Sequence, residues 1–551
     1  MAEKVLTIKY DENDLKEKYY TAIKKENVYE AQLIYNRLRP LNNSEINLRQ
    51  AIIYSMLNSH CREIDYLLKV VADLGFVNYS PVSILMRLSV FFNVYEMIDS
   101  FDFYKELLLL KHPNDINLVK AKNPNQSKYT RRIHLVEEES KFIYGDAINL
   151  MSAGEPKQAL DKLFTIQKND PMYTRAQNLA SVIYLSTGEV EKSKELILKL
   201  IEDKACDAEI INNVYRFSGF SKEEKEKLLD GLEDLKSESN EYEVSMLKAS
   251  LLLEDNNYEQ ALKETQTIKN YLQYSEPLLK QKAICYLRLN NKEALYDTLK
   301  MLYTIYPTNI GARYLAIQLE NGAEDINYKY LFNHFDRSMK KDLIKLLKTE
   351  LSGHNDFNEL SLEQVEFLFN IVKEVKDYVL MKKTTKVILK SKYSFLIQEA
   401  LMSTEVSNEN QQLIFQVLVE EQSKEFWSML VFGRIETMQI DIPQFFKTAI
   451  VEDREKFDYL LTAYAQTYSL LYYVGVDIDS IAVDMNDILV NLYEAPLENK
   501  EFQILTNIHY LVYMLIQHMY PQENLFEHTF MDITDAQKQE INSLLNILNK
   551  K

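Results

Sequence analysis

Apolar residues recur along this chain at the spacing of an amphipathic helix. Between residues 141 and 200, the first stripe consists of Ile143, Ala147, Leu150 and Met151, at i, i+4, i+7 and i+8. Three further stripes are separated by short polar breaks; their members are Ala159, Leu163 and Ile166, then Ala176, Ala180, Ile183 and Tyr184, then Ser193, Ile197, Leu200 and Ile201. The pattern predicts two consecutive pairs of antiparallel helices in this window.

The expected turns between paired helices recur with a nearly constant period. A residue that readily adopts the left-handed backbone that closes a helix stands at each of them: Gly154, Gly188, Gly219, Asn256, Asn290 and Gly322. The intervals are 34, 31, 37, 34 and 32 residues. A repeat of this length predicts stacked helix pairs. Small residues such as Ala147 and Ala159 let the two helices of a pair approach closely.

The rest of the chain follows the pattern less regularly. Residues 12–110 are expected to form three further helix pairs, within an N-terminal region of residues 1–110. Residues 111–138 contain two prolines and few apolar residues, which predicts a linker or extended loop before the repeats of residues 139–322. Beyond Gly322 the period is hard to follow, so residues 323–551 are expected to form a divergent helical region that continues the solenoid or folds against its end. Trp427, in an apolar segment, is expected to fill the core.

Composition supports helices throughout. Only 11 glycines and 11 prolines occur in 551 residues, while 46% of the residues are hydrophobic. These glycine and proline contents lie well below average usage of about 7% and 5%. The chain therefore has few turn-formers and ample material for a core, and we predict an all-α fold, an α-solenoid of antiparallel helix pairs.

Charge and cysteine usage restrict the class of function. The formal net charge is -18, which disfavours nucleic acid as the main partner because phosphate binding depends on clustered lysine and arginine. Three scattered cysteines predict neither a disulfide framework nor a metal site. The N-terminus shows no export signal, and the uncharged stretches 459–476 and 503–522 contain polar side chains typical of buried helices. We therefore expect a cytoplasmic protein without a membrane span.

We find no catalytic signature in the sequence. There is no glycine-rich phosphate loop, no G-x-S-x-G, no H-E-x-x-H and no C-x-x-C. His509 and His518 are nine residues apart, which on a helix sets them on opposite sides. We therefore expect no cofactor and no metal.

Three basic clusters stand out in this acidic chain. Lys120, Lys122, Lys128, Arg131 and Arg132 lie in the expected linker, which is either a docking strip for an acidic partner or a solvated connection. Two more lie on helices, and their members are Lys340, Lys341, Lys345 and Lys348, then Lys382, Lys383, Lys386, Lys390 and Lys392. Each helical cluster is either a solvated face or a contact for an acidic protein or nucleic acid.

The repeats resemble the tetratricopeptide repeat family. The residues that carry the resemblance are Ala147, Leu150, Gly154, Ala159, Leu163 and Pro171 in one unit, Ser181, Tyr184, Gly188, Ser193 and Ile197 in the next, and Ala249, Leu252, Asn256, Ala261, Ala283, Tyr286, Asn290, Ala294 and Pro307 in two more. The aromatic residue that the family has early in the first helix is mostly missing, and proline recurs at only two unit ends. The resemblance implies a right-handed superhelix whose first helices line a concave groove for a peptide.

The same resemblance assigns five residues to the groove, although they could also be surface or packing residues. They are Tyr144, Ile148, Arg175, Asn178 and Val182. Some members of the family bind a terminal carboxylate through paired lysine and asparagine side chains. Here only Arg175 is basic, so a clamp of this kind is not expected.

We therefore expect a non-catalytic scaffold that binds protein or peptide partners through its concave groove. The alternative is a peptide-responsive regulator, in which the superhelix changes shape and acts on a partner protein. A third possibility is an enzyme whose site among the C-terminal helices carries no known motif. The sequence does not identify the partner or the oligomeric state.

Overall fold

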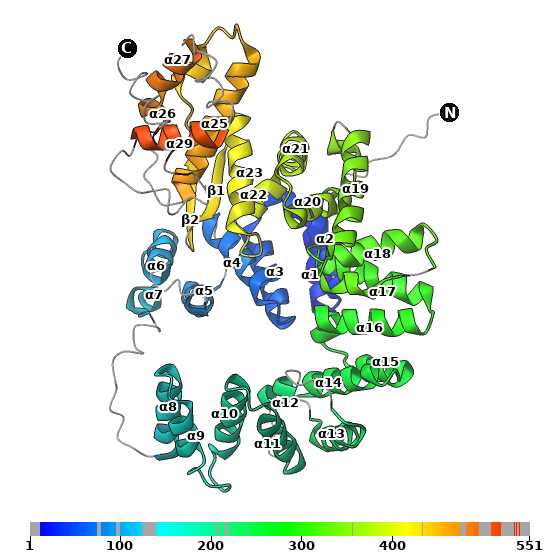
Figure 1. Ribbon diagram of the computed structural model, residues 1–551. Coiled ribbons are helices and arrows are strands. Elements are labelled where there is room, and N and C mark those ends of the chain that lie inside the picture. Colours follow the sequence, from blue (N-terminus) through cyan, green and yellow to red (C-terminus); the bar gives the residue numbers. More distant parts are fainter. Residues whose placement is uncertain are drawn as a thin grey trace. The chain divides into compact units, whose positions relative to one another are not determined.

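The structure is a computed structural model of the whole chain. The residues that it describes are 12–73, 79–94, 100–123, 139–204, 208–214, 220–237, 240–324, 326–354, 356–431, 433–473, 481–494 and 508–519, with isolated positions beyond these. Their secondary structure is helical almost throughout, so the predicted all-α fold is confirmed (Figure 1).

The chain folds as two compact units, each discontinuous in sequence. Unit 1 comprises Met1–Ile34, Ser55–Ser59 and Gln126–His334, and unit 2 comprises Tyr35–Tyr54, His60–Asn125 and Phe335–Lys551. The sequence analysis expected four consecutive segments instead. N-terminal residues take part in both units, because their packing partners lie hundreds of positions further along the chain.

Unit 1 is built from successive antiparallel helix pairs (Figure 1). Its elements are α1 (Glu12–Lys24), α8 (Glu139–Ser152), α9 (Pro156–Leu163), α10 (Tyr173–Ser186), α11 (Val190–Glu202), α12 (Ala208–Val214), α13 (Lys222–Leu235), α14 (Glu241–Glu254), α15 (Tyr258–Thr267), η3 (Tyr271–Tyr274), α16 (Glu276–Arg288), α17 (Lys292–Ile305), α18 (Ile310–Glu320) and η4 (Tyr328–Phe332). The division between the units falls within α2 (Val28–Leu38) and near the end of α3 (Ser44–Met56).

The described turns within these pairs share one backbone conformation. Their central residues have positive φ: 78° at Gly154, 82° at Gly188, 60° at Asn256, 55° at Asn290 and 77° at Gly322. At each turn this residue and the next donate to helix carbonyls three and five positions back, the hydrogen-bond pattern of a Schellman motif. These five predicted turns are confirmed, whereas the sixth lies outside the described residues.

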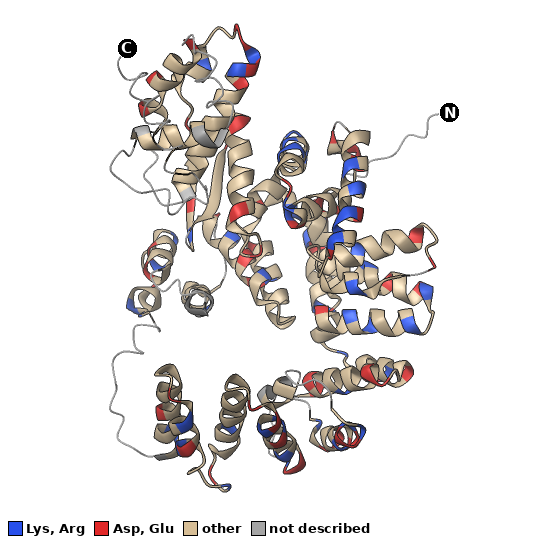
Figure 2. Cartoon of the chain, in the orientation of Figure 1, with Lys and Arg blue, Asp and Glu red and all other residues tan. Residues whose placement is uncertain are grey.

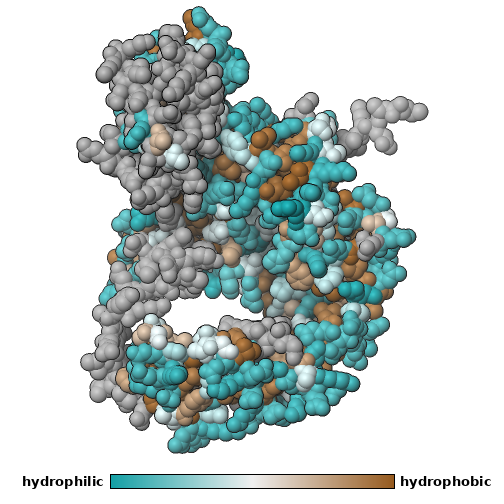
Figure 3. Space-filling view, in the orientation of Figure 1, coloured by the Kyte–Doolittle hydropathy of each residue, from teal (hydrophilic) through white to brown (hydrophobic). Residues whose placement is uncertain are grey.

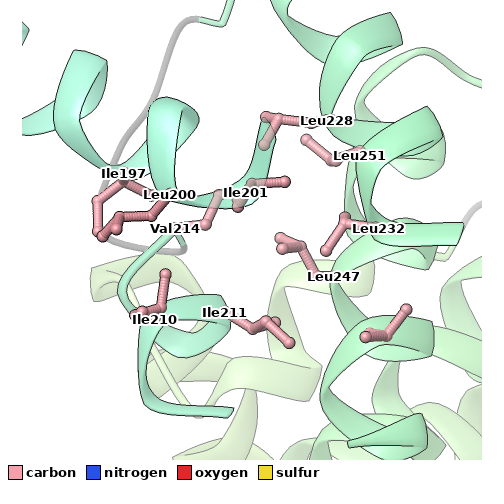
Figure 4. Close-up of a cluster of buried hydrophobic side chains, with 11 residues drawn as sticks. Ile197, Leu200, Ile201, Ile210, Ile211, Val214, Leu228, Leu232, Leu247 and Leu251 are labelled. Atoms are coloured by element: carbon pink, nitrogen blue, oxygen red, sulfur yellow. The ribbon is translucent and has the colours of Figure 1, made fainter. Parts of the chain in front are cut away.

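Apolar side chains from consecutive pairs interdigitate to form the core of unit 1. Figure 4 shows one cluster, in which α11, α12, α13 and α14 contribute Ile197, Leu200, Ile201, Ile210, Ile211, Val214, Leu228, Leu232, Val244, Leu247 and Leu251. In the preceding cluster, the small residues Ala147, Ala159, Ala176 and Ala180 are fully buried. The stripes predicted from the sequence are therefore the faces that stack.

Polar side chains reinforce the stacking of unit 1 at intervals close to one repeat. The Gln281 amide donates to Ser250 Oγ at 2.6 Å, and Asn309 Nδ2 donates to Glu276 Oε1 at 2.9 Å. These partners lie 31 and 33 residues apart. A longer connection ties in the N-terminal helix, because Tyr271 Oη of η3 donates to the Ile23 carbonyl at 3.0 Å.

Unit 2 combines N-terminal and C-terminal helices. In addition to most of α3, it contains η1 (Arg39–Leu41), α4 (His60–Ala72), α5 (Pro81–Val94), α6 (Ser100–Lys111), α7 (Ile116–Lys120), α19 (Arg337–Gly353), η5 (Phe357–Glu359), α20 (Leu362–Val375), α21 (Tyr378–Leu389), α22 (Phe395–Leu401), α23 (Asn408–Glu420), β1 (Phe426–Val431), β2 (Arg434–Gln439), α24 (Gln444–Thr448), α25 (Arg454–Tyr473), α26 (Ile481–Asp484), α27 (Asn486–Glu494) and α29 (Ile508–Met519).

An interval of one repeat also occurs in unit 2, between the turns that precede α20 and α22. Tyr393 Oη donates to the Leu360 carbonyl at 2.7 Å, 33 residues away. The backbone amide of Lys392 donates to Asn358 Oδ1 at 2.7 Å, 34 residues away. Helices α20 and α22, which follow these two turns, are therefore offset by about one repeat.

An antiparallel β-hairpin interrupts the helices and was not predicted. Strands β1 and β2 pair from Phe426 with Gln439 to Val431 with Arg434. Trp427 on β1 is buried, as expected, and its indole nitrogen donates to Ser423 Oγ at 3.0 Å. The segment is rich in aromatic and branched residues, which favour strands as readily as a helix core.

The N-terminal part of the expected linker is folded rather than extended. Asp115 caps α7 by accepting from the Leu118 amide, and the Leu118 side chain is fully buried. Lys105 Nζ also donates to the carbonyls of Val119 and Ala121. Residues 124–138, with Lys128, Arg131 and Arg132, lie outside the described residues.

We predict that Gly311→Ala destabilises the protein, because α18 approaches η4 closely at this position. A Cβ at Gly311 would lie 1.7 Å from the Tyr330 carbonyl oxygen, and overpacking of this kind costs about 1–3 kcal/mol. The matched control is Gly145→Ala in α8, where a Cβ meets no atom within 4 Å and removing a helical glycine stabilises by about 0.5–1 kcal/mol. Urea unfolding followed by circular dichroism measures both, and equal midpoints would contradict the close approach.

Candidate functional site

The five residues that the sequence analysis assigned to a groove lie on α8 and α10 and differ in exposure. Ile148 is 43% exposed, and Arg175 is also exposed. Tyr144 and Val182 are half-buried, and Tyr144 packs against the cluster around Ala147. Ile148 and Arg175 are therefore the two members with the most surface available to a partner.

Asn178, the fifth of these residues, is buried and already bonded within the unit. Its side-chain oxygen accepts from Asn213 Nδ2 at 2.6 Å, which joins α10 to α12, the first helix of the next pair. Asn213 was not singled out from the sequence, although it lies 35 residues after Asn178, close to one repeat. The assignment of the other four residues to a binding groove stays a prediction.

Among the described residues, unit 2 contains a buried ion-pair network. The Arg39 guanidinium contacts both oxygens of Glu366 at 2.8 and 3.1 Å, and its Nε lies 2.9 Å from Glu399 Oε1. Lys69 Nζ donates to the same Glu399 oxygen at 2.7 Å. These four side chains are only 9–18% exposed. The network therefore joins η1 and α4 to α20 and α22.

Aromatic rings surround the cations of this network. The Tyr54 and Tyr66 rings stack with centroids 5.4 Å apart. Lys69 Nζ lies 4.5 Å from the Tyr66 centroid, and the Arg62 guanidinium lies 5.5 Å from that of Tyr54. Arg62 also pairs with Glu405 at 3.5 Å. Cation–π contact in a desolvated setting adds to the attraction of the carboxylates.

Two carboxyl groups of the network have opposite pKa shifts. Burial alone would raise the pKa of Glu399, but the charges of Arg39 and Lys69 lower it from 4.5 to about 2. Burial and the charge of Glu405 raise the pKa of Asp65 to about 6. Hydrogen bonds from Ser403 and Thr404 to the Asp65 carboxylate oppose that shift.

The charges of this cluster compensate one another. Among the described residues it contains as many cations as anions, namely Arg39, Arg62, Lys69 and Lys373 against Asp65, Glu366, Glu399 and Glu405. Functional sites often contain perturbed carboxyl groups, but structural networks perturb them too. Because the Arg39 and Lys69 cations face carboxylates directly, we interpret the cluster as a structural connection within unit 2. The sequence could not reveal it, since Arg39 and Glu399 are 360 residues apart.

The basic face of α21 that was noted in the sequence is also neutralised within unit 2. Lys382 and Lys386 pair with Glu420 at 2.5 and 3.8 Å, and Lys386 and Lys390 pair with Glu421 at 2.6 and 3.2 Å. These lysines were expected to face solvent or an acidic partner, and their partner is the end of α23.

The same ion pairs border a cavity of about 590 Å³ between α21, the end of α23 and α25. Phe446, Phe457 and Leu461 provide apolar walls, while Arg454 and Asp458 add one charge of each sign. Arg454 and Asp458 pair with each other at 3.1 Å. The charges that line the cavity are therefore mutually satisfied, and the cavity offers no unbalanced group to a ligand.

The described residues contain no cluster of histidine, cysteine and acidic side chains that could hold a metal ion. Cys285 is buried, and burial raises the pKa of its thiol to about 11, which keeps it protonated and unreactive. Cys206 and the side chains of His509 and His518 lie outside the described residues. Within the described part of the chain, we also find no helix both long and apolar enough to cross a membrane.

No protein-family model matches the chain, and a search of curated proteins finds no match either. The functional argument therefore depends on the geometry described above.

We predict that Glu399→Gln destabilises unit 2 by about 3 kcal/mol at neutral pH, because Arg39 and Lys69 lose a buried counter-charge. A pKa of about 2 in place of 4.5 corresponds to a similar free energy of about 3 kcal/mol. Since this pKa is lowered by folding, the contribution is present above about pH 4.5 and disappears as the pH falls toward 2. The free energy of unfolding of the variant should therefore lack the part of its decrease at acid pH that comes from protonation of Glu399.

The matched control is Glu409→Gln, which removes the same charge from an exposed pair. Lys376 and Glu409 are 3.4 Å apart, and their side chains are 59% and 63% exposed, so the loss should stay below about 1 kcal/mol. Denaturant unfolding between about pH 3 and 8 measures both variants. Equal free energies of unfolding would contradict a structural role of the network.

Proposed function

We propose that this chain is a non-catalytic scaffold of the tetratricopeptide type that binds another protein through the first helices of unit 1. The observation that carries the proposal is the exposure of Ile148 and Arg175 on α8 and α10. Both helices pack their buried faces against neighbours, so these outward side chains are the ones that a partner could contact.

Exposed apolar residues on α8 and at the end of α9 support this proposal. Phe142 on α8 is 68% exposed, and Phe164, directly after α9, is 44% exposed. Hydrophilic residues cover most of the described surface in the space-filling view, and apolar residues form separate patches (Figure 3). Apolar surface left exposed beside a binding helix can contribute to a contact with a partner.

The stacking of unit 1 also suits a binding role. Bonds such as Asn178 to Asn213 and Gln281 to Ser250 hold successive first helices in register. A rigid row of helices presents its outward side chains with little loss of conformational entropy on binding. We propose a cytoplasmic protein, in agreement with a buried, protonated Cys285 and no disulfide framework in the sequence.

The test is an affinity capture from native lysate with the full chain as bait. Wild type should retain a defined partner, and Ile148→Glu combined with Arg175→Glu should reduce its recovery about tenfold, because an apolar and a cationic contact are both reversed. Peptide-dependent changes in small-angle scattering of the same samples would favour the regulatory alternative over a static scaffold.

The matched control combines Val190→Glu with Lys199→Glu on α11. Val190 is 43% exposed, like Ile148, and Lys199 is exposed, like Arg175. These substitutions change the charge and apolar surface equally but lie on a second helix. The proposed groove would be wrong if the control lost the partner as strongly as the α8 and α10 variant.

A further inference from the structure

Four basic side chains form a stripe along the exposed face of α19. Arg337, Lys341, Lys345 and Lys348 follow one another at intervals of four, four and three residues. At 3.6 residues per turn they occupy an arc of about 80° and extend over about 16 Å. All four are exposed, whereas Met339, Leu343, Leu347 and Leu351 on the opposite face are buried. Figure 2 shows the concentration of basic residues on this helix.

The α19 stripe differs from the other basic helix of unit 2 in having no counter-charges. Among the described residues, no ion pair or hydrogen bond involves the charged group of Arg337, Lys341, Lys345 or Lys348. On α21, by contrast, Lys382, Lys386 and Lys390 lie within 4.0 Å of Glu420 or Glu421. Four like charges on one helix face repel one another, so the stripe weakens α19 unless an external anion compensates it.

The stripe is one helix face wide, which restricts the kind of partner. On one flank lies the exposed Asp342, and on the other Lys340 pairs with Glu374 at 3.5 Å. A nucleic-acid duplex is wider than this surface and would set its phosphates against these carboxylates. The chain as a whole carries a net charge of -18, and α19 contains no aromatic residue on which a base could stack.

We propose that the α19 stripe is a docking surface for an acidic segment of a protein partner, separate from the groove of α8 and α10. Carboxylates spaced about 6 Å apart, one helical turn, would face successive members of the stripe. Each exposed pair contributes modestly, so the stripe acts mainly by speeding association and selecting acidic partners.

The experiment uses the full chain and a fluorescent, alanine-based peptide that carries glutamates every fourth residue. Wild type should bind it at about 20 mM salt and more weakly at about 150 mM, where exposed charges are screened. Lys341→Glu combined with Lys345→Glu should weaken binding at least about tenfold. Lys341→Gln combined with Lys345→Gln, which removes the charges without reversing them, should weaken it less. Fluorescence anisotropy measures the affinities, and circular dichroism checks that each variant is folded.

The matched control combines Lys292→Glu with Lys300→Glu on α17, where both lysines are also exposed. This control should bind the peptide like wild type. Failure of wild type to bind at low salt, or equal loss in the α19 and α17 variants, would overturn the proposal. Tighter binding of a fluorescent DNA duplex through the same lysines would also overturn it, in favour of a nucleic-acid surface. Because the groove residues are unchanged in every variant, the result is independent of the proposed scaffold function.

Discussion

The arrangement of unit 2 depends on the buried ion pairs of Arg39. One guanidinium holds Glu366 and Glu399, which lie 327 and 360 residues further along the chain. Desolvation offsets much of the attraction within a buried ion pair, but removing or displacing one partner leaves an uncompensated buried charge. A shift of α20 or α22 would separate Glu366 or Glu399 from Arg39 and leave its buried charge partly uncompensated. The network therefore fixes which helices pack together.

The features that could be predicted from the sequence are those set by local interactions. Gly154 and Asn290 identify turns because a positive φ is a property of one residue and its immediate neighbours. The ion pairs of Arg39 and the pairing of Asn178 with Asn213 join distant positions, and no local signal marks them. The hairpin beginning at Phe426 was missed because short apolar runs fit a buried helix and a strand equally well.

The loss of the repeat signal after Gly322 has a physical reason. The described turns within the pairs of unit 1 pass through glycine or asparagine, whereas the left-handed residues after α20 and α23 in unit 2 are Lys376 and Gln422. The left-handed turn conformation is the same, but lysine and glutamine do not mark it in the sequence as glycine and asparagine do. Contacts at separations of 33 and 34 residues show the period that the turn residues no longer reveal.

The hydrogen bond between Tyr271 and Ile23 has a consequence for synthesis on the ribosome. The two residues are 248 positions apart, and translation proceeds at roughly 5–20 residues per second. Helix α1 therefore emerges on the order of 10–50 s before the tyrosine that it contacts. During this interval its buried residues Tyr19 and Ala22 have no native neighbour from η3. The contact between α1 and η3 therefore forms only after synthesis has passed Tyr271, so docking of the N-terminal helix is a late step in the assembly of unit 1.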